Sequence, residues 1–331
     1  MHAYITSIGL ISPQETAGNR FSFDLTYENA PLLRCIEPDY KQLIPPLQLR
    51  RMSRILKMGL GAAQICLKNT ENLQPDAILV GTGLACINEL ETFMLSMLEN
   101  GEQGLSSIPF INSSHNTVAA QISRMLHNHG YNSTYCHRGA SFESALTDAL
   151  MLLNEKNAEH VLLGGIDEYS KQYHLMLQKL GHAAVGGEGA AFFLLSRVPA
   201  GKVFARVTAV RTCYKPAADF IDTFLSAHHL HNDDIDTVLC GVNGNMQDDR
   251  IYDHPAERIF RRDTQWASYK HLCGEYTTSG SFALALAACS LLDGRFPASC
   301  ILRNPRRPQR ILIYNHYHRL NYSLTVVETV R

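Results

Sequence analysis

Short apolar runs alternate along this chain with longer segments in which apolar residues recur every three or four positions. The runs predict buried strands and the longer segments predict amphipathic helices, an alternation typical of an α/β protein. The predicted strands are 4–10, 77–80, 133–136, 160–163, 191–195, 204–210, 237–239, 311–315 and 323–327. The predicted helices are 47–68, 87–99, 117–128, 141–156, 217–228, 254–260 and 279–292.

The chain also contains a faint internal repeat. Residues 76–81 (DAILVG) are echoed by residues 236–241 (DTVLCG), and each segment reads as a short buried strand that ends in a glycine. Each half closes with strand-like runs, at 190–196 and 311–328. These features predict a duplicated α/β core, with residues 1–200 as one half and 201–331 as the other.

Composition excludes several classes of function. The 331 residues are 45% hydrophobic and 18% charged, which is enough to bury a large core. Thirty basic and 31 acidic residues give a formal net charge of -1, so no basic excess indicates nucleic-acid binding. No apolar stretch is long enough to cross a bilayer, and the first residues do not resemble a signal peptide.

The cysteines and histidines predict neither a metal site nor a cofactor. The nine cysteines show no CxxC spacing, and several, such as Cys66 and Cys240, lie in apolar runs. They indicate reduced core thiols and therefore a cytoplasmic protein. His228, His229 and His231 are close in sequence, but their spacing fits no common zinc pattern and the stretch reads as a polar loop.

Four motifs follow one another in the first half of the chain. They are RRMSR at 50–54, VGTGL at 80–84, NTVAAQI at 116–122 and HAAVGGEGA at 182–190. In this order they resemble the β-ketoacyl synthases of the thiolase fold. The resemblance implies a five-layered α/β/α/β/α arrangement made of two similar halves.

The resemblance also locates the catalytic residues of that family. The cysteine nucleophile corresponds to Gly139, in the run YCHRGAS at 135–141, and the first histidine corresponds to Gly241. A lysine is retained as Lys270, but Glu275 stands where the second histidine is expected. A glycine cannot be acylated, and an ionised glutamate would repel the carboxylate that malonate loses. The family's glycine-rich loop is replaced by NHYHRLN at 315–321, so the resemblance implies no condensation by this chain alone.

Lys270 and Glu275 have two interpretations. They are either a remnant of the active site or an ion pair that fills the emptied cavity, and the second is favoured because a buried charge needs a partner.

The resemblance assigns two further regions to contacts with a partner subunit. A helical stripe after the glycine turn is explained by core packing, but the family places it along the acyl tunnel at the dimer interface. Its residues are Leu84, Cys86, Leu90, Phe93, Met94 and Met97. The strand before the nucleophile position forms the dimer interface in the family, because an unpaired edge there needs a partner. Its residues are Asn132, Ser133, Thr134, Tyr135 and Cys136.

Together these features resemble a chain length factor. Such a subunit lacks catalytic residues, forms a heterodimer with an active ketosynthase and shapes the tunnel that the two share. The short chain and the extensive loss of motifs resemble the partner subunits of bacterial aryl polyene pathways. The expected partners are therefore the ketosynthase and an acyl carrier protein. Arg50, Arg51 and Arg54 either meet that acidic carrier or form a solvated helix face.

Two other functions remain open. The chain could be an independent acyltransferase or thioesterase that uses Cys136 or Ser141 as its nucleophile. If Cys136 and His137 belong to one strand, however, their side chains point to opposite faces and do not form a catalytic pair. Alternatively, the chain could bind an acyl carrier protein or a lipid without any elongation partner.

Overall fold

Two groups of five strands repeat the same arrangement in the computed structural model, which describes residues 2–17, 20–21, 32–50, 52–68, 70, 73–182, 184–199 and 201–330. The first group is β1 (Ala3–Ile11), β5 (Ala77–Gly81), β6 (Tyr131–Tyr135), β7 (His160–Asp167) and β9 (Gly189–Ser196). The second group is β10 (Ala205–Tyr214), β11 (Thr237–Cys240), β12 (Gln265–Ser268), β14 (Arg310–Tyr317) and β15 (Asn321–Glu328).

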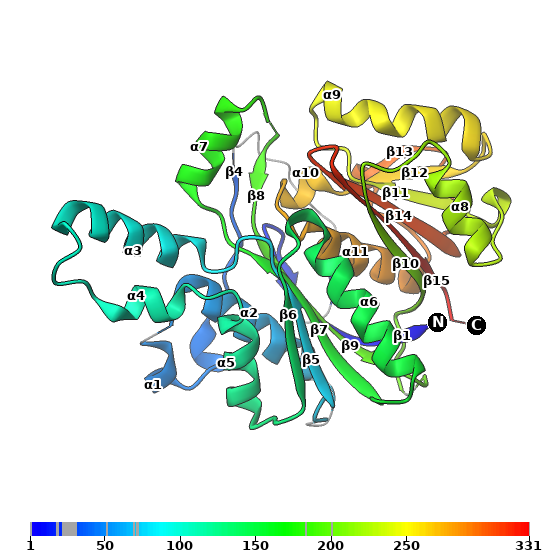
Figure 1. Cartoon of the computed structure of the whole chain (residues 1–331). Helices are drawn as coiled ribbons and strands as arrows, with labels where there is room; N and C mark the ends of the chain where they lie inside the picture. Colours follow the sequence, from blue (N-terminus) through cyan, green and yellow to red (C-terminus); the bar gives the residue numbers. More distant parts are fainter. Residues whose placement is uncertain are drawn as a thin grey trace.

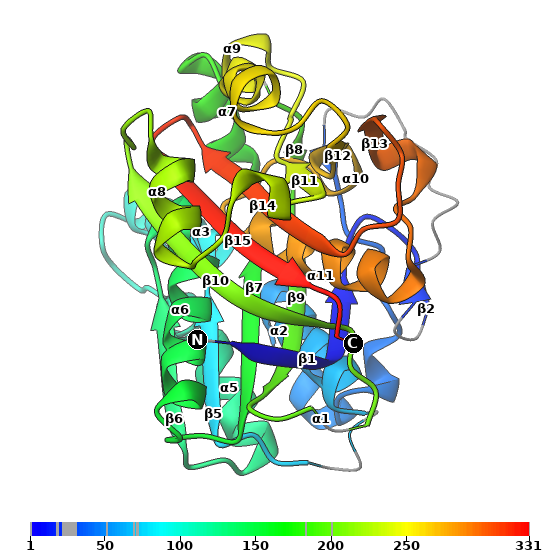
Figure 2. The same ribbon diagram turned by 90° about the vertical axis from the view of Figure 1, so that its right-hand side faces the viewer.

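Numbered from one to five along the chain, the strands of each group lie side by side in the order 3-2-4-5-1. In each group the fifth strand runs antiparallel to its neighbours, while the second strand is parallel to the third and the fourth. The predicted duplication is therefore confirmed as a fold, while the division at residues 1–200 and 201–331 stays a prediction. β1 pairs with β10 where the halves meet, as Figure 2 shows, and β13 (Ile301–Arg303) adds an edge strand beside β12.

The two groups are joined in one 11-stranded sheet, and helices cover the outer face of each group and fill the space between the groups (Figure 1). α2 (Arg54–Leu67) and α5 (Thr117–Leu126) pack on the first half, and α8 (Phe220–Ala227) packs on the second. α6 (Ser141–Asn154) and α11 (Ser279–Asp293) share one apolar cluster with strands of both halves. This is the five-layered α/β/α/β/α arrangement that the sequence predicted.

The remaining elements are short or lie at the surface. The helices are α1 (Pro46–Leu49), α3 (Ile87–Asn100), α4 (Ser107–Asn112), α7 (Lys171–Lys179), α9 (Met246–Asp249) and α10 (Lys270–Cys273). The strands β2 (Thr16–Ala17) and β3 (Arg20–Phe21) pair with each other, as do β4 (Leu32–Leu33) and β8 (Gly186–Gly187). The helix predicted at 254–260 is a π-helical segment, Pro255–Ile259.

The prediction of one helix over 47–68 was wrong. α1 ends at Leu49, and α2 begins only at Arg54 because Ser53 has an extended backbone, with φ -63° and ψ 166°. The apolar residues of α2 do recur at helical spacing, as predicted. Ten residues of the helix are buried against β1 and β9.

α6 carries a buried carboxyl group between the two halves. Oε1 of Glu143 accepts a hydrogen bond from Ser323 Oγ at 3.0 Å, whereas Oε2 has no hydrogen-bond partner among the described residues. A Cβ at Gly280 of α11 would lie 2.3 Å from this Oε1, so a larger residue there would displace the carboxyl group. Burial raises the pKa of Glu143 to about 7.

Glu143→Gln is expected to make unfolding less sensitive to pH. Between about 4.5, the ordinary pKa, and about 7, the folded wild type holds a proton that the unfolded chain releases, so its stability falls as the pH rises. Urea unfolding at pH 5 and pH 8 should show the variant gaining about 3 kcal/mol over the wild type at the higher pH. The exposed control Glu102→Gln should show no such gain. Parallel pH curves for wild type and Glu143→Gln would contradict this assignment.

Candidate degenerate acyl site

The three positions predicted to correspond to the family's catalytic residues, Gly139, Gly241 and Glu275, lie around the end of β14. At Gly139 a Cβ would lie 2.1 Å from Cβ and 2.6 Å from Cγ of Tyr317, the last residue of that strand. Real Cβ atoms do not approach other atoms so closely, so no side chain fits at Gly139 while Tyr317 keeps this position. Tyr317 therefore fills the space of the missing nucleophile.

The position of the first missing histidine is filled in the same way. At Gly241 a Cβ would lie 2.5 Å from Asn315 Oδ1 and 3.0 Å from Lys270 Cε. An imidazole at this position would displace both side chains.

At the third position, Glu275 forms an ion pair with the retained lysine. Lys270 Nζ lies 2.8 Å and 3.0 Å from the two carboxylate oxygens and donates a third hydrogen bond, of 3.1 Å, to the carbonyl of His316. The two side chains are only 1% and 12% exposed, and Asn243 Nδ2 donates to Glu275 Oε2 at 2.9 Å. This geometry supports the interpretation that the pair fills an emptied cavity.

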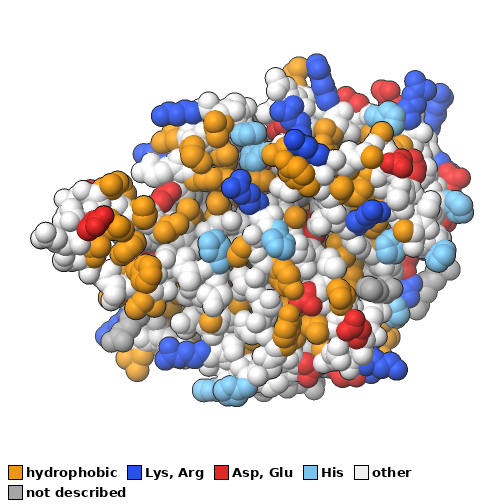
Figure 3. Space-filling view, in the orientation of Figure 1, with side chains coloured by type: hydrophobic (Ala, Val, Ile, Leu, Met, Phe, Trp, Pro, Cys, Tyr) orange, Lys and Arg blue, Asp and Glu red, His pale blue; other side chains and the backbone are white. Residues whose placement is uncertain are grey.

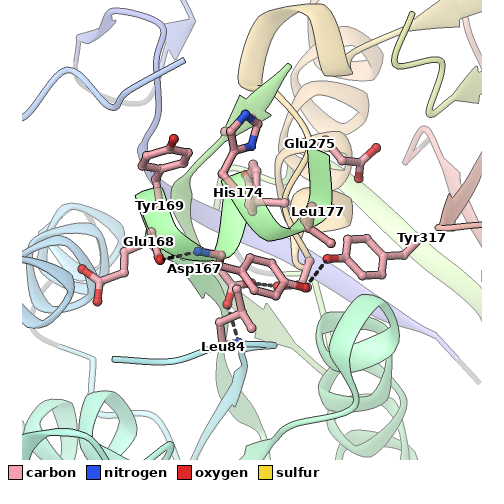
Figure 4. A pocket seen from close by; sticks show the side chains of 14 residues that line it. Leu84, Asp167, Glu168, Tyr169, His174, Leu177, Glu275 and Tyr317 are labelled. Carbon is pink, nitrogen blue, oxygen red and sulfur yellow. Dashed lines mark hydrogen bonds between the residues drawn. The ribbon is translucent and has the colours of Figure 1, made fainter. Parts of the chain in front are cut away.

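What remains of the site is a cavity of about 40 Å³ beneath α7 (Figure 4). Tyr317 points into it, and its hydroxyl lies 3.0 Å from that of Tyr173 on α7. This space holds only a few water molecules. Of the six predicted tunnel residues, Leu84 alone lines this cavity, and the assignment of the six to a tunnel at a dimer interface stays a prediction.

Asp167, which the sequence interpretation missed, fixes the floor of this cavity. Its buried carboxylate accepts hydrogen bonds from the backbone N–H groups of Gly83 and Leu84, both at 2.9 Å, in the glycine turn of the first half. It also accepts from Thr277 Oγ1 and, at 2.8 Å, from Thr278 Oγ1 in the second half. Burial raises the pKa of Asp167, and these hydrogen bonds oppose that shift. One carboxylate thus joins the two halves at the site.

The candidate nucleophiles of the alternative enzyme are poorly placed for catalysis. β6 ends at Tyr135, so the prediction that Cys136 belongs to the strand was wrong by one residue, and Cys136 is exposed. Partial burial and the nearby Asp167 raise the pKa of Cys136 to about 11, which keeps the thiol protonated at neutral pH. Ser141 Oγ is buried and donates to the carbonyl of Arg138 at 2.6 Å. Among the described residues, neither side chain is hydrogen-bonded to an imidazole or a carboxylate.

Arg54 does not belong to a free basic surface. Its guanidinium donates to both oxygens of the fully buried Glu188, at 2.6 Å and 2.7 Å, and to Glu37 at 2.6 Å. Arg50 is exposed, whereas Arg51 lies outside the described residues. The prediction that Arg54 meets an acidic carrier protein is therefore replaced by a structural role.

Within the described ranges, no group of three His, Cys, Asp or Glu side chains is arranged to hold a metal ion. No helix found in those ranges has the length and apolar character needed to span a membrane.

α3 and α4 form an arm that projects from the first half (Figure 1). Both helices are fully described, and none of their residues is buried. Figure 3 shows apolar side chains spread over this arm. The large apolar residues exposed on it are Leu90, Met94, Leu95, Leu98, Ile108, Phe110 and Ile111. An apolar surface of this kind marks a site of interaction.

β6 lies at one end of the strand order and leaves one backbone edge without a neighbour among the described strands. Two of its predicted interface residues are engaged within the chain, because Asn132 Nδ2 donates to the carbonyl of Ala119 at 3.0 Å and Tyr135 OH donates to Asp148 at 2.7 Å. The remaining backbone edge is still open to a partner.

Comparison with known proteins agrees with this geometry. Residues 34–186, somewhat less than half of the chain, match the family model described as beta-ketoacyl synthase, N-terminal domain. This part of the chain is therefore similar to the N-terminal domain of the β-ketoacyl synthases. A search of curated proteins gave no match.

Solved structures extend the likeness to the whole β-ketoacyl synthase-like chain. The ishigamide ketosynthase/chain length factor superimposes with a TM-score of 0.83 at 13% identity, covering 100% of this chain and 99% of that one. The ketosynthase ApeO in complex with its chain length factor ApeC, from Xenorhabdus doucetiae, gives 0.79 at 14% identity, covering 99% and 98%. AntDE:AntF, a type II acyl-carrier protein in complex with its ketosynthase, gives 0.74 at 14% identity, covering 99% of each. At these identities the structures establish the thiolase-like ketosynthase fold.

Proposed function

We propose that this chain is a non-catalytic chain length factor. It forms a heterodimer with an active β-ketoacyl-ACP synthase and shapes the tunnel in which the acyl chain grows. The observation that carries this proposal is Tyr317, whose side chain occupies the space beside Gly139 where a nucleophile would project. The filled position at Gly241 and the Lys270–Glu275 pair add support from two further places.

The apolar arm and the open edge of β6 support the heterodimer. Leu90, Phe93, Met94 and Met97 lie on α3, where a partner subunit would cover them and complete a tunnel wall. Two of the similar structures are ketosynthases with chain length factors, and a third contains an acyl-carrier protein. We therefore propose that an acyl carrier protein delivers the growing chain to the ketosynthase subunit.

Two finer assignments belong to the same proposal. The extensive loss of motifs supports a pathway of the aryl polyene type, and the nine free cysteines support a cytoplasmic location. An independent acyltransferase is less well supported, because neither Cys136 nor Ser141 has an activating base among the residues that the structure describes.

Co-expression with its ketosynthase tests the proposal. We expect size-exclusion chromatography to show a heterodimer and mass spectrometry to show products of a defined chain length. Met94→Glu/Leu98→Glu should weaken the heterodimer at least tenfold, since it places two charges in an apolar interface. Met246→Glu, at an exposed methionine on α9, is the matched control and should leave assembly unchanged.

Two outcomes would overturn the proposal: a stable homodimer of this chain, or normal elongation by the ketosynthase without it. A chain that binds the carrier protein alone and changes no product would instead be a binding module.

A further inference from the structure

A cluster of arginines lies at the far edge of the second half. Segments 255–263 and 301–307 contain six exposed arginines and only two carboxylates, Glu257 and Asp263. The arginines are Arg258, Arg261, Arg262, Arg303, Arg306 and Arg307. The whole chain has a formal net charge of -1, so these segments differ sharply from the rest of the molecule. Figure 3 shows basic side chains gathered at the upper right, over the helical segment that follows α9.

Hydrogen bonds hold the two segments together as one surface, which we call the arginine edge. Asn304 Nδ2 donates to the carbonyls of Arg262 and Thr264, at 2.6 Å and 3.1 Å. Arg303 donates to the carbonyl of Ala256 at 2.9 Å, and its guanidinium stacks 5.1 Å from the centre of the Trp266 ring. The backbones of the two segments are therefore fixed relative to each other, and the guanidinium of Arg303 is held in place.

Most of this charge is not neutralised inside the chain. Asp263 accepts from Arg261 at 2.8 Å and lies 3.7 Å from Arg306. Arg258, Arg262 and Arg307 form no ion pair with any described residue.

Protection of a sheet edge does not explain the cluster. Charged residues on an edge strand prevent pairing with other chains. In β13 (Ile301–Arg303), however, Arg303 alone performs that role, and the other five arginines lie outside any strand.

We propose that the arginine edge binds a carboxylate-rich segment of a partner protein. The planar guanidinium pairs with carboxylates through two parallel hydrogen bonds. A membrane surface fits less well, because Leu302 is the only large apolar residue exposed among these described segments. The arginine edge lies beyond β12, at the opposite end of the strand order from β6. An acidic partner can therefore bind there while β6 and the arm hold the proposed ketosynthase.

The test measures binding of a fluorescent Glu-rich peptide by anisotropy, with a Gln-rich peptide of the same length as the neutral probe. Binding should be specific for the Glu-rich peptide and should weaken as salt is raised from 50 to about 200 mM. Arg258→Glu/Arg262→Glu/Arg307→Glu breaks no ion pair among the described residues and should weaken binding at least tenfold. Lys41→Glu/Lys156→Glu/Lys171→Glu, three exposed lysines elsewhere, makes the same change in charge and should alter binding less than twofold.

Equal loss in the two triple variants would overturn the proposal, because it would show a response to net charge alone. Tighter binding to phosphatidylglycerol vesicles than to the peptide would overturn it in favour of a lipid surface. Circular dichroism of each variant confirms that it remains folded.

Discussion

Lys270→Met is expected to lower the free energy of unfolding by about 4 kcal/mol. The substitution leaves the carboxylate of Glu275, which is 12% exposed, facing a nearly dry site with Asn243 as its remaining hydrogen-bond partner. Removing one partner of a buried ion pair lowers the free energy of unfolding far more than removing both partners. Urea unfolding at pH 7 measures the loss.

The double variant Lys270→Met/Glu275→Gln distinguishes the contribution of the ion pair to stability from the contribution of side-chain packing. The glutamine removes the orphaned charge and keeps an oxygen for Asn243, so the double variant should recover most of the lost stability. Lys41→Met, at an exposed lysine, should change stability by less than about 0.5 kcal/mol. If the double variant is as unstable as Lys270→Met, the lysine stabilises by packing and not by pairing.

Gly139→Cys is expected to destabilise the chain by about 3 kcal/mol, because the new Cβ would lie 2.1 Å from that of Tyr317. Tyr317→Gly should cost about 4 kcal/mol through the cavity that it opens. In the double variant the thiol occupies part of that cavity, so the combined loss should be smaller than the sum by about 2 kcal/mol.

This double-mutant cycle tests whether one side chain fills the place of the other. Tyr317→Phe is the control, since it removes only the hydroxyl contact with Tyr173 and should cost about 1 kcal/mol. Additive effects in the cycle would show that Tyr317 and position 139 do not compete for space. The introduced thiol should still support no condensation, because Gly241 and Glu275 provide no histidine.

The fold could be predicted where buried segments consist of apolar residues in a recognisable pattern. β5 is buried at every position and therefore reads as an uninterrupted apolar run. β12 (QWAS) was missed because its polar ends are buried, with Gln265 Oε1 accepting from the backbone N–H of Arg306. α7 was also missed, although Tyr173, Met176 and Leu177 recur at helical spacing, because the helix is short and none of its described residues is buried.

The site could be predicted only in part for a related reason. The missing side chains at Gly139 and Gly241 are visible in a linear comparison of motifs, and so is the exchange at Glu275. The groups that fill the gaps come from distant segments, such as Tyr317 beside Gly139 and Thr278 beside Asp167. The packing of the two halves against each other brings these residues together, and no short sequence motif predicts it.

The contact between Tyr317 and Gly139 also constrains how the sequence of this chain can evolve. A single mutation of Gly139 to cysteine would place the new side chain against Tyr317 and destabilise the fold without providing catalysis. Removing the tyrosine first opens a hole in a folded protein and brings no catalytic gain. If the proposed function is right, a return to catalysis therefore requires both changes together, and neither change alone is expected to be favoured.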